Sequence, residues 1–180
     1  MALSLSTSFF RDGLPPGLPT KTERLVLVAA TQSLANAADD DQAQFSAMLS
    51  AKVPETWPPE FVNAPSTGDE SVWENCYLLK VDPDGGQSML VGIAGIRQWS
   101  SGETIQVGAA IVPEYHGQGL GEEIVAALGN WALTRFGIDT VVCDVPEFHV
   151  PSAKSLRRAG YTMATHAPSP GFNRFELKAR

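Results

Sequence analysis

Hydrophobic residues follow two different periods along the chain, and together they predict alternating strands and helices. The apolar run Thr22–Ala29 predicts a first strand. Residues 31–50 favour helix, with Thr31 or Ser33 able to cap one segment and the acidic residues 39–41 able to start another. Residues 53–71 predict a loop with at most one short helix.

The middle of the chain predicts an antiparallel meander of three strands, at residues 77–81, 89–96 and 104–112. Residues 82–86 join the first two strands, because Pro83 presets φ and the two following glycines permit positive φ. A second turn is predicted at residues 100–102.

The last third alternates again between helix and strand. Leu120, Ile124, Leu128 and Trp131 share one face of a predicted helix at 120–136, which Gly137 ends. A strand, a helix and two strands are predicted next, at residues 139–145, 152–159, 161–165 and 172–177. The order predicts an α/β (α+β) fold with one mixed, mostly antiparallel sheet flanked by helices. Residues 1–21 read as an irregular extension and 22–180 as one domain.

Composition and charge narrow the function classes. The net charge is −7 and basic residues do not cluster beyond Arg157 and Arg158, so a nucleic-acid partner is not expected. The two cysteines predict buried, reduced thiols, and no metal-ligand spacing occurs. The sequence shows neither a signal peptide nor an apolar run of the ~20 residues that a membrane helix needs, so a cytoplasmic location is expected.

The stretch Ile111–Glu123 carries the strongest chemical signal. A strand runs into a loop with Gly117, Gly119 and Gly121, and an amphipathic helix follows. The first amides of a helix have no partner in the helix, the dipole adds positive charge there, and glycines let an anion approach the backbone. This pattern predicts a phosphate site. Position 122 is Glu rather than the third glycine of GxGxxG, and the Lys of a Walker A loop is absent.

The run Val112–Gly121 resembles the acetyl-CoA motif of the GNAT N-acetyltransferases, and Glu123 matches the acidic residue often found beyond it. Residues 23–27 and 91–96 resemble that family's opening strand and the strand before the motif. His149–Ser152, with Leu156 and Ala159–Tyr161, resembles a segment of its ribosomal-protein-type members.

The resemblance implies acetyl-CoA as cosubstrate and a set of residues that hold it. The loop amides would cradle the diphosphate, a strand edge would pair with the pantetheine arm, and one amide would polarise the thioester carbonyl. The implied donor-binding residues are Ile111, Val112, His116, Gly117, Gln118, Gly119, Leu120, Gly121, Glu122 and Ser152.

Several positions depart from the family pattern. His116 replaces Arg or Gln, His149 replaces Asn, Leu156 stands where many members have a Tyr acid, and Gln106 stands where Glu is frequent. The candidate proton acceptors are therefore Glu103 and His149, with Glu74, His116 or a relayed water as alternatives. For each side chain the competing interpretation is a purely structural or solvated role.

The acceptor is expected to be a primary amine, on a small molecule or a protein N-terminus. Trp57, Glu74 and Trp99 are candidate residues of its site, although Trp57 could equally anchor a loop in the core. The resemblance also allows a homodimer. A second hypothesis is a catalytically inactive acyl-CoA-binding module, and a third is a nucleotide-binding protein that uses the glycine loop.

Overall fold

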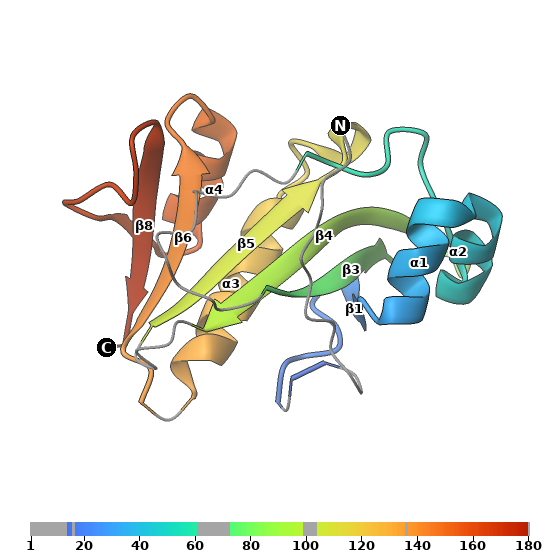
Figure 1. The fold of residues 1–180 in the computed structure, drawn as a ribbon, viewed down its shortest axis with the longest axis horizontal. Helices are drawn as coiled ribbons and strands as arrows, with labels where there is room; N and C mark the ends of the chain where they lie inside the picture. Colours follow the sequence, from blue (N-terminus) through green and yellow to red (C-terminus); the bar gives the residue numbers. More distant parts are fainter. Residues whose placement is uncertain (1–13, 16, 61–72, 99–103, 136, 180) are drawn as a thin grey trace.

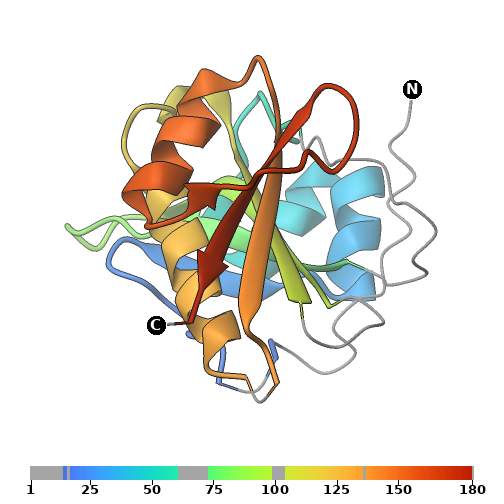
Figure 2. The ribbon, with the colours of Figure 1, turned by 90° about the vertical axis from the view of Figure 1, so that its left-hand side faces the viewer.

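The computed structural model describes residues 14–15, 17–60, 73–98, 104–135 and 137–179. One twisted sheet separates two groups of helices. The first group is α1 (Gln32–Asp40) and α2 (Gln42–Leu49), and the second is α3 (Leu120–Leu133) and α4 (Val150–Arg158). Figures 1 and 2 show α3 and α4 on one side of the sheet and α1 and α2 on the other. The predicted fold class is confirmed.

The sheet runs in the order β1-β3-β4-β5-β6-β8-β7. Its bounds are β1 (Leu25–Ala29), β3 (Glu74–Lys80), β4 (Ser88–Gln98), β5 (Thr104–Ile111), β6 (Thr140–Pro146), β7 (Thr162–Met163) and β8 (Phe172–Lys178). The neighbours on this path pair antiparallel except β5 and β6, which are parallel and are connected through α3. A short strand, β2 (Ala51–Lys52), pairs parallel with β4 and was not predicted.

Local chemistry explains where most elements begin. Thr31 caps α1 and Asp41 caps α2, each by accepting a bond from a backbone amide three residues ahead, so residues 31–50 form two helices as their capping residues indicate. Helix α4 begins at Val150, before the predicted residue 152, with Pro151 in its first turn. The predicted turn at 100–102 and most of the loop 53–71 lie outside the described residues.

Apolar side chains form one cluster on each face of the sheet. The larger cluster joins the sheet to α3 and includes the fully buried Ile124, Leu128 and Phe175. Tyr161 closes it, because its hydroxyl donates to the Val125 carbonyl at 3.0 Å and lies 2.3 Å from where a Cβ on Gly129 would stand. Only glycine at position 129 allows that contact.

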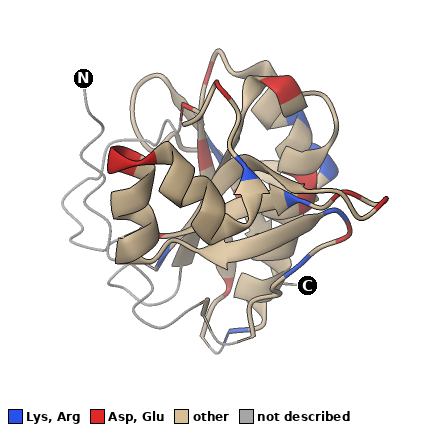
Figure 3. Cartoon of the chain, turned by 90° about the vertical axis from the view of Figure 1, so that its right-hand side faces the viewer, with Lys and Arg blue, Asp and Glu red and all other residues tan. Residues whose placement is uncertain are grey.

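The smaller cluster lies under α1 and α2 and is built around Phe45, whose ring contacts those of Trp57 and Tyr77. Figure 3 shows acidic residues at one end of α1 and few other charges on this helix pair. Neither helix contains Lys or Arg.

Cys76 and Cys143 are free and buried, which confirms the prediction of two reduced thiols. Burial raises the pKa of each thiol to about 12. Among the described residues, no helix has the length and apolar content needed to cross a bilayer.

Candidate functional site

A gap between β5 and β6 is the central feature of the site. The two strands pair from Thr104 and Thr140 as far as Gln106 and Val142. Both then continue, β5 to Ile111 and β6 to Pro146, but they diverge without further pairing (Figure 1). Because the strands are parallel, the loops that follow them lie at the same open end of this gap.

The edge of β5 that borders the gap offers backbone groups. The Val112 amide donates to the Val91 carbonyl of β4 at 2.9 Å, and the Val112 carbonyl accepts from Tyr115. Since backbone groups alternate between the two edges of a strand, Ala109 and Ile111 face away from β4 and toward the gap. Val112, predicted to pair with a ligand, therefore has its amide committed inside the sheet.

His116 lies against the same edge. Its Nε2 is 2.6 Å from the Ile111 carbonyl oxygen, so the ring donates a hydrogen bond to a group that faces the gap. The position that usually carries Arg or Gln thus contributes a side-chain contact here. That contact joins the end of β5 to the start of the glycine loop.

The loop between β5 and α3 presents unpartnered backbone. A 3-10 turn, η1 (Pro113–Tyr115), leads into Gly117 and Gly119, whose φ angles are +75° and +77°. Gly119 is the N-cap of α3 and supplies no capping side chain to the first amides of the helix. A Cβ at Gly117 or Gly121 would meet nothing within 4 Å, which leaves room for a ligand against the backbone.

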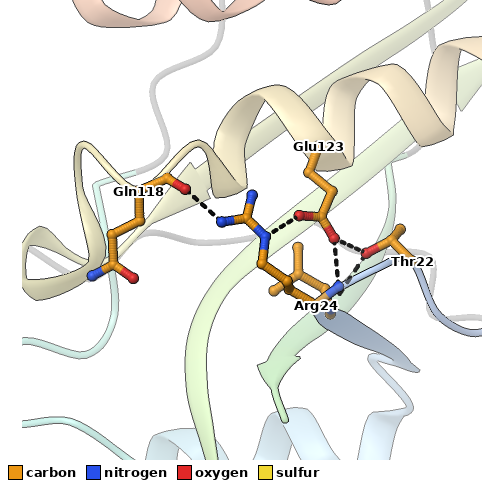
Figure 4. A network of polar contacts seen from close by, with 5 residues as sticks. Thr22, Arg24, Gln118 and Glu123 are labelled. Carbon is orange, nitrogen blue, oxygen red and sulfur yellow. Dashed lines mark hydrogen bonds and ion pairs between the residues drawn. The ribbon is translucent and has the colours of Figure 1, made fainter. Parts of the chain in front are cut away.

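A clasp of four residues ties this loop to the start of β1 (Figure 4). Arg24 donates from Nε to Glu123 Oε2 at 2.7 Å and from Nη1 to the Gln118 carbonyl at 2.7 Å. The Arg24 amide donates to Glu123 Oε1 at 2.8 Å, and the Thr22 hydroxyl donates to the same oxygen. Glu123 was expected here, whereas Arg24 and Thr22 were not recognised as its partners.

The clasp stabilises the ionised form of Glu123 and places a positive charge beside it. Partial burial acts to raise the pKa of Glu123, but the bonds from Thr22 and Arg24 and the Arg24 charge outweigh it, so the pKa is lowered. The second acidic residue of the first turn, Glu122, has Arg158 of α4 3.9 Å away. Each carboxylate at this helix start therefore has a cation beside it.

The start of α4 supplies the titratable groups at the other side of the open end. His149 is the N-cap of α4, and its Nδ1 lies 2.7 Å from Ser152 Oγ. The structure thus joins His149 and Ser152 in one pair. Leu156, at the position of the family's Tyr, is 2% exposed and packs in the core.

A buried polar network, which we call the vertex network, crosses the sheet where β5 and β6 part. Arg97 donates to the side-chain oxygen of Gln106, and the Gln106 amide donates to Asp144 at 3.1 Å. Arg174 then contacts both Asp144 oxygens at 2.8 Å. Gln106, Asp144 and Arg97 are each less than 10% exposed. Of these four residues only Gln106 was singled out from the sequence, because Asp144 and Arg174 come from strands that are distant in sequence and no local pattern marks Arg97.

The remaining predicted site residues are dispersed. Trp57 packs its ring on Phe45 and Tyr77, and its neighbour Thr56 donates to Glu114 of η1, so its loop adjoins the glycine loop. Glu74 lies opposite Ile96 in the sheet, and partial burial raises its pKa. Glu103 and Trp99 lie outside the described residues.

These features fit the diphosphate and the amide-bearing arm of acetyl-CoA. The loop offers free helix-start amides beside glycines that leave the backbone open. The gap-facing groups of β5 suit an extended chain that adds as a strand. Within the described part of the chain, no group of three His, Cys, Asp or Glu side chains could hold a metal ion.

Comparisons with known proteins agree with this architecture. A putative ribosomal-protein-serine acetyltransferase from Vibrio cholerae has a similar structure, with a TM-score of 0.60, 17% identity, and coverage of 92% of this chain and 100% of that chain. A GNAT-family acetyltransferase from Bacillus anthracis has a TM-score of 0.50 at 13% identity, over 58% of this chain and 65% of that chain. At these identities the likeness is one of fold.

A comparison with proteins of curated function gives no match. The sequence does match the family model described as "Acetyltransferase (GNAT) domain" over residues 24–162. That match spans three of the four clasp residues, the glycine loop, the gap and α4, and it covers well over half of the chain, so the protein belongs to the GNAT acetyltransferases.

Proposed function

We propose that this acetyltransferase moves an acetyl group from acetyl-CoA to a primary amine by direct attack while both substrates are bound. The observation that carries the proposal is the coincidence of the gap and the glycine loop. The edge of β5 that faces the gap ends at Ile111, and the unpartnered amides of the α3 start follow it within ten residues. A diphosphate and an extended thioester arm need these two features side by side.

In this proposal the donor is held almost entirely by backbone. The amides of Gly117–Gly121 and Glu122 bind the diphosphate, and the buried side chain of Leu120 fixes the helix start behind them. Ala109 and Ile111 pair with the arm, and one of their amides polarises the thioester carbonyl. Val112 and His116 support this edge through their bonds to Val91 and Ile111.

The proton balance of the reaction needs two further groups. An alkylamine with a pKa of about 10.4 must lose a proton at a cost of about 4 kcal/mol at pH 7.4 before it attacks the acetyl carbon. As the amide bond forms, the bond between the acetyl carbon and the CoA sulfur breaks. The CoA sulfur leaves as a thiolate, and the thiolate takes up a proton. We assign Ser152, polarised by His149, to the thiol side, because this pair stands at the open end of the gap.

The group that takes the amine proton must lie elsewhere than at position 106, where family members frequently have a Glu. Gln106 cannot accept a proton, and its side chain is bonded to Arg97 and Asp144. Glu103, which precedes β5, is our candidate, and Glu74 is the alternative because its raised pKa favours proton uptake nearer neutral pH. Trp57 and Trp99 are proposed to form walls of the acceptor site.

Two observations favour one competing function. The Gln106 side chain is already bonded to its neighbours, and Leu156 is buried in the core. A chain that lacks both the usual base and the usual acid could bind acyl-CoA without transferring the acyl group. Such a protein would act as a regulatory module. Both candidates predict CoA binding, and only the first predicts turnover.

Release of the CoA thiol from acetyl-CoA in the presence of a panel of amines separates them. The panel contains alkylamines, an aminoglycoside and peptides with a free N-terminus, one of which begins with serine because the Vibrio cholerae neighbour bears that description. The buried thiols, with pKa values of about 12, contribute no background to a thiol reagent. Turnover above the acceptor-free rate supports the transferase. Binding without turnover on any amine supports the module, and absence of CoA binding rejects both.

A further inference from the structure

We propose that Arg24 is a positioning residue for the donor diphosphate, through its hold on the Gln118 peptide and on Glu123. The inference rests on the proposed function, since it assigns a residue to the same donor site. Arg24 lies at the start of the first strand, almost one hundred residues before the loop that it orients.

The guanidinium contacts two different parts of the helix start at once. Nε bonds the Glu123 carboxylate and Nη1 bonds the Gln118 carbonyl, both at 2.7 Å, so the planar fork sets their relative position. Thr22 and the Arg24 amide hold the second Glu123 oxygen, which leaves the carboxylate 12% exposed and fixed (Figure 4).

The bond to Gln118 determines where an adjacent amide points. In a trans peptide the C=O and the following N–H point in opposite directions. Because the Gln118 carbonyl is drawn toward Arg24, the Gly119 amide is turned away from it, to the side that the clasp leaves open. Gly119, which follows this peptide, has a positive φ, and so does Gly117, which precedes Gln118. Without the bond the peptide could therefore rotate and present its oxygen instead.

The bond to Glu123 removes a repulsion. A carboxylate in the first turn of a helix competes with any anion for the same amides and the same dipole. Arg24 neutralises Glu123 on the side of β1, away from those amides. Loss of Arg24 would therefore weaken diphosphate binding in two ways. It would release the Gln118 peptide, and it would leave the negative charge of Glu123 without its cation.

The test compares Arg24→Gln with a matched control, Arg158→Gln. Both arginines pair with a glutamate in the first turn of α3, but Arg158 is 72% exposed, lies 3.9 Å from Glu122 and holds no carbonyl. Calorimetry with CoA is expected to give an increase in Kd of about tenfold to hundredfold for Arg24→Gln and about twofold or less for Arg158→Gln. Arg24→Lys keeps the charge without the fork and should fall between them.

A second readout separates positioning from a role in folding alone. Adenosine 3′-phosphate 5′-diphosphate, the nucleotide half of CoA, is titrated into the 15N-labelled protein while the Gly117 and Gly119 amide resonances are followed. These resonances should move in the wild type and in Arg158→Gln and should lose most of their response in Arg24→Gln and Arg24→Lys. A residue that only fastened β1 to α3 would lower the melting temperature and leave the Kd and these shifts unchanged.

The outcomes are distinct. If wild type binds CoA and Arg24→Gln binds it as tightly as Arg158→Gln, the role of Arg24 is rejected and the proposed function stands. If wild type shows no heat with CoA at millimolar concentration, the proposed function fails and the inference fails with it. A retained Gly119 response in folded Arg24→Lys and Arg24→Gln would also overturn the inference.

Discussion

The glycine loop and the vertex network lie at opposite ends of the stretch of β5 that does not pair with β6, and they use different chemical groups. The loop uses backbone amides within ten consecutive residues, so its chemistry is contained in one local segment. The vertex network uses three buried side chains from β4, β5 and β6 and the partly buried Arg174 of β8. A backbone site tolerates changes of side-chain identity as long as glycines remain, whereas the network depends on every member.

Removal of one charge from the network should have the largest effect on stability. Asp144→Asn leaves the buried part of Arg174 without its carboxylate and should lower the free energy of unfolding by about 3 kcal/mol. Lys178→Gln is the control, because it breaks the ion pair with Glu176 at a lysine that is 66% exposed and keeps the Glu176 charge, which also acts on Arg174. It should cost less than about 1 kcal/mol. Urea unfolding measures both, and equal losses would show that the network does not differ from a surface pair.

A bulky side chain in place of Gly119 should strongly weaken CoA binding while the protein still folds. Gly119→Val forces a branched residue into a φ of +77° and brings its Cβ within 3.4 Å of Arg24, so CoA affinity should fall by about a hundredfold or more. Gly85→Val imposes a φ of +80° on a β-branched residue in the turn between β3 and β4, away from the loop. It should cost similar stability and leave the Kd unchanged. A similar Kd for both variants would refute a donor site at Gly119.

A smaller change can separate stability from binding within one variant. Gly121 has no positive φ and no neighbour within 4 Å of an added Cβ, and it lies in the first turn of α3. Gly121→Ala should raise the free energy of unfolding by about 0.5–1 kcal/mol through helix propensity. The same methyl group should weaken CoA binding about tenfold, since it projects where the diphosphate approaches. Calorimetry and urea unfolding should thus move in opposite directions, and unchanged affinity would place the ligand elsewhere.

The smallest expected effect concerns the pH dependence of the clasp. The pKa of Glu123 is lowered in the fold, so its contribution to stability is present above the ordinary glutamate pKa and is lost as pH falls through the lowered value. The difference in unfolding free energy between wild type and Glu123→Gln should be under about 1 kcal/mol at pH 7, because Arg24 is partly exposed. The difference should shrink as the pH is lowered below the ordinary glutamate pKa, and a difference that is independent of pH would contradict the assignment.

The sequence allowed the fold to be predicted because its signals are local. The alternation of apolar residues, the caps Thr31 and Asp41, and the turn at 82–86 each act over a few residues and agree with one another. The missed strand β2 has two residues, too few to produce a period. The predicted strand at 161–165 is shorter in the structure, where only Thr162 and Met163 pair in register with β8.

The sequence by itself determined the glycine loop and the start of α3, because helix-start amides and positive glycine φ angles follow directly from residues 111–121. Only the tertiary structure decided which distant groups contact one another in and around the site. Arg24 reaches Gln118, Arg174 reaches Asp144, and the Val112 amide is taken by Val91 because the sheet order brings distant strands together. Strands that are consecutive in the sequence usually lie side by side, whereas the placement of strands that are far apart in the sequence depends on the tertiary packing.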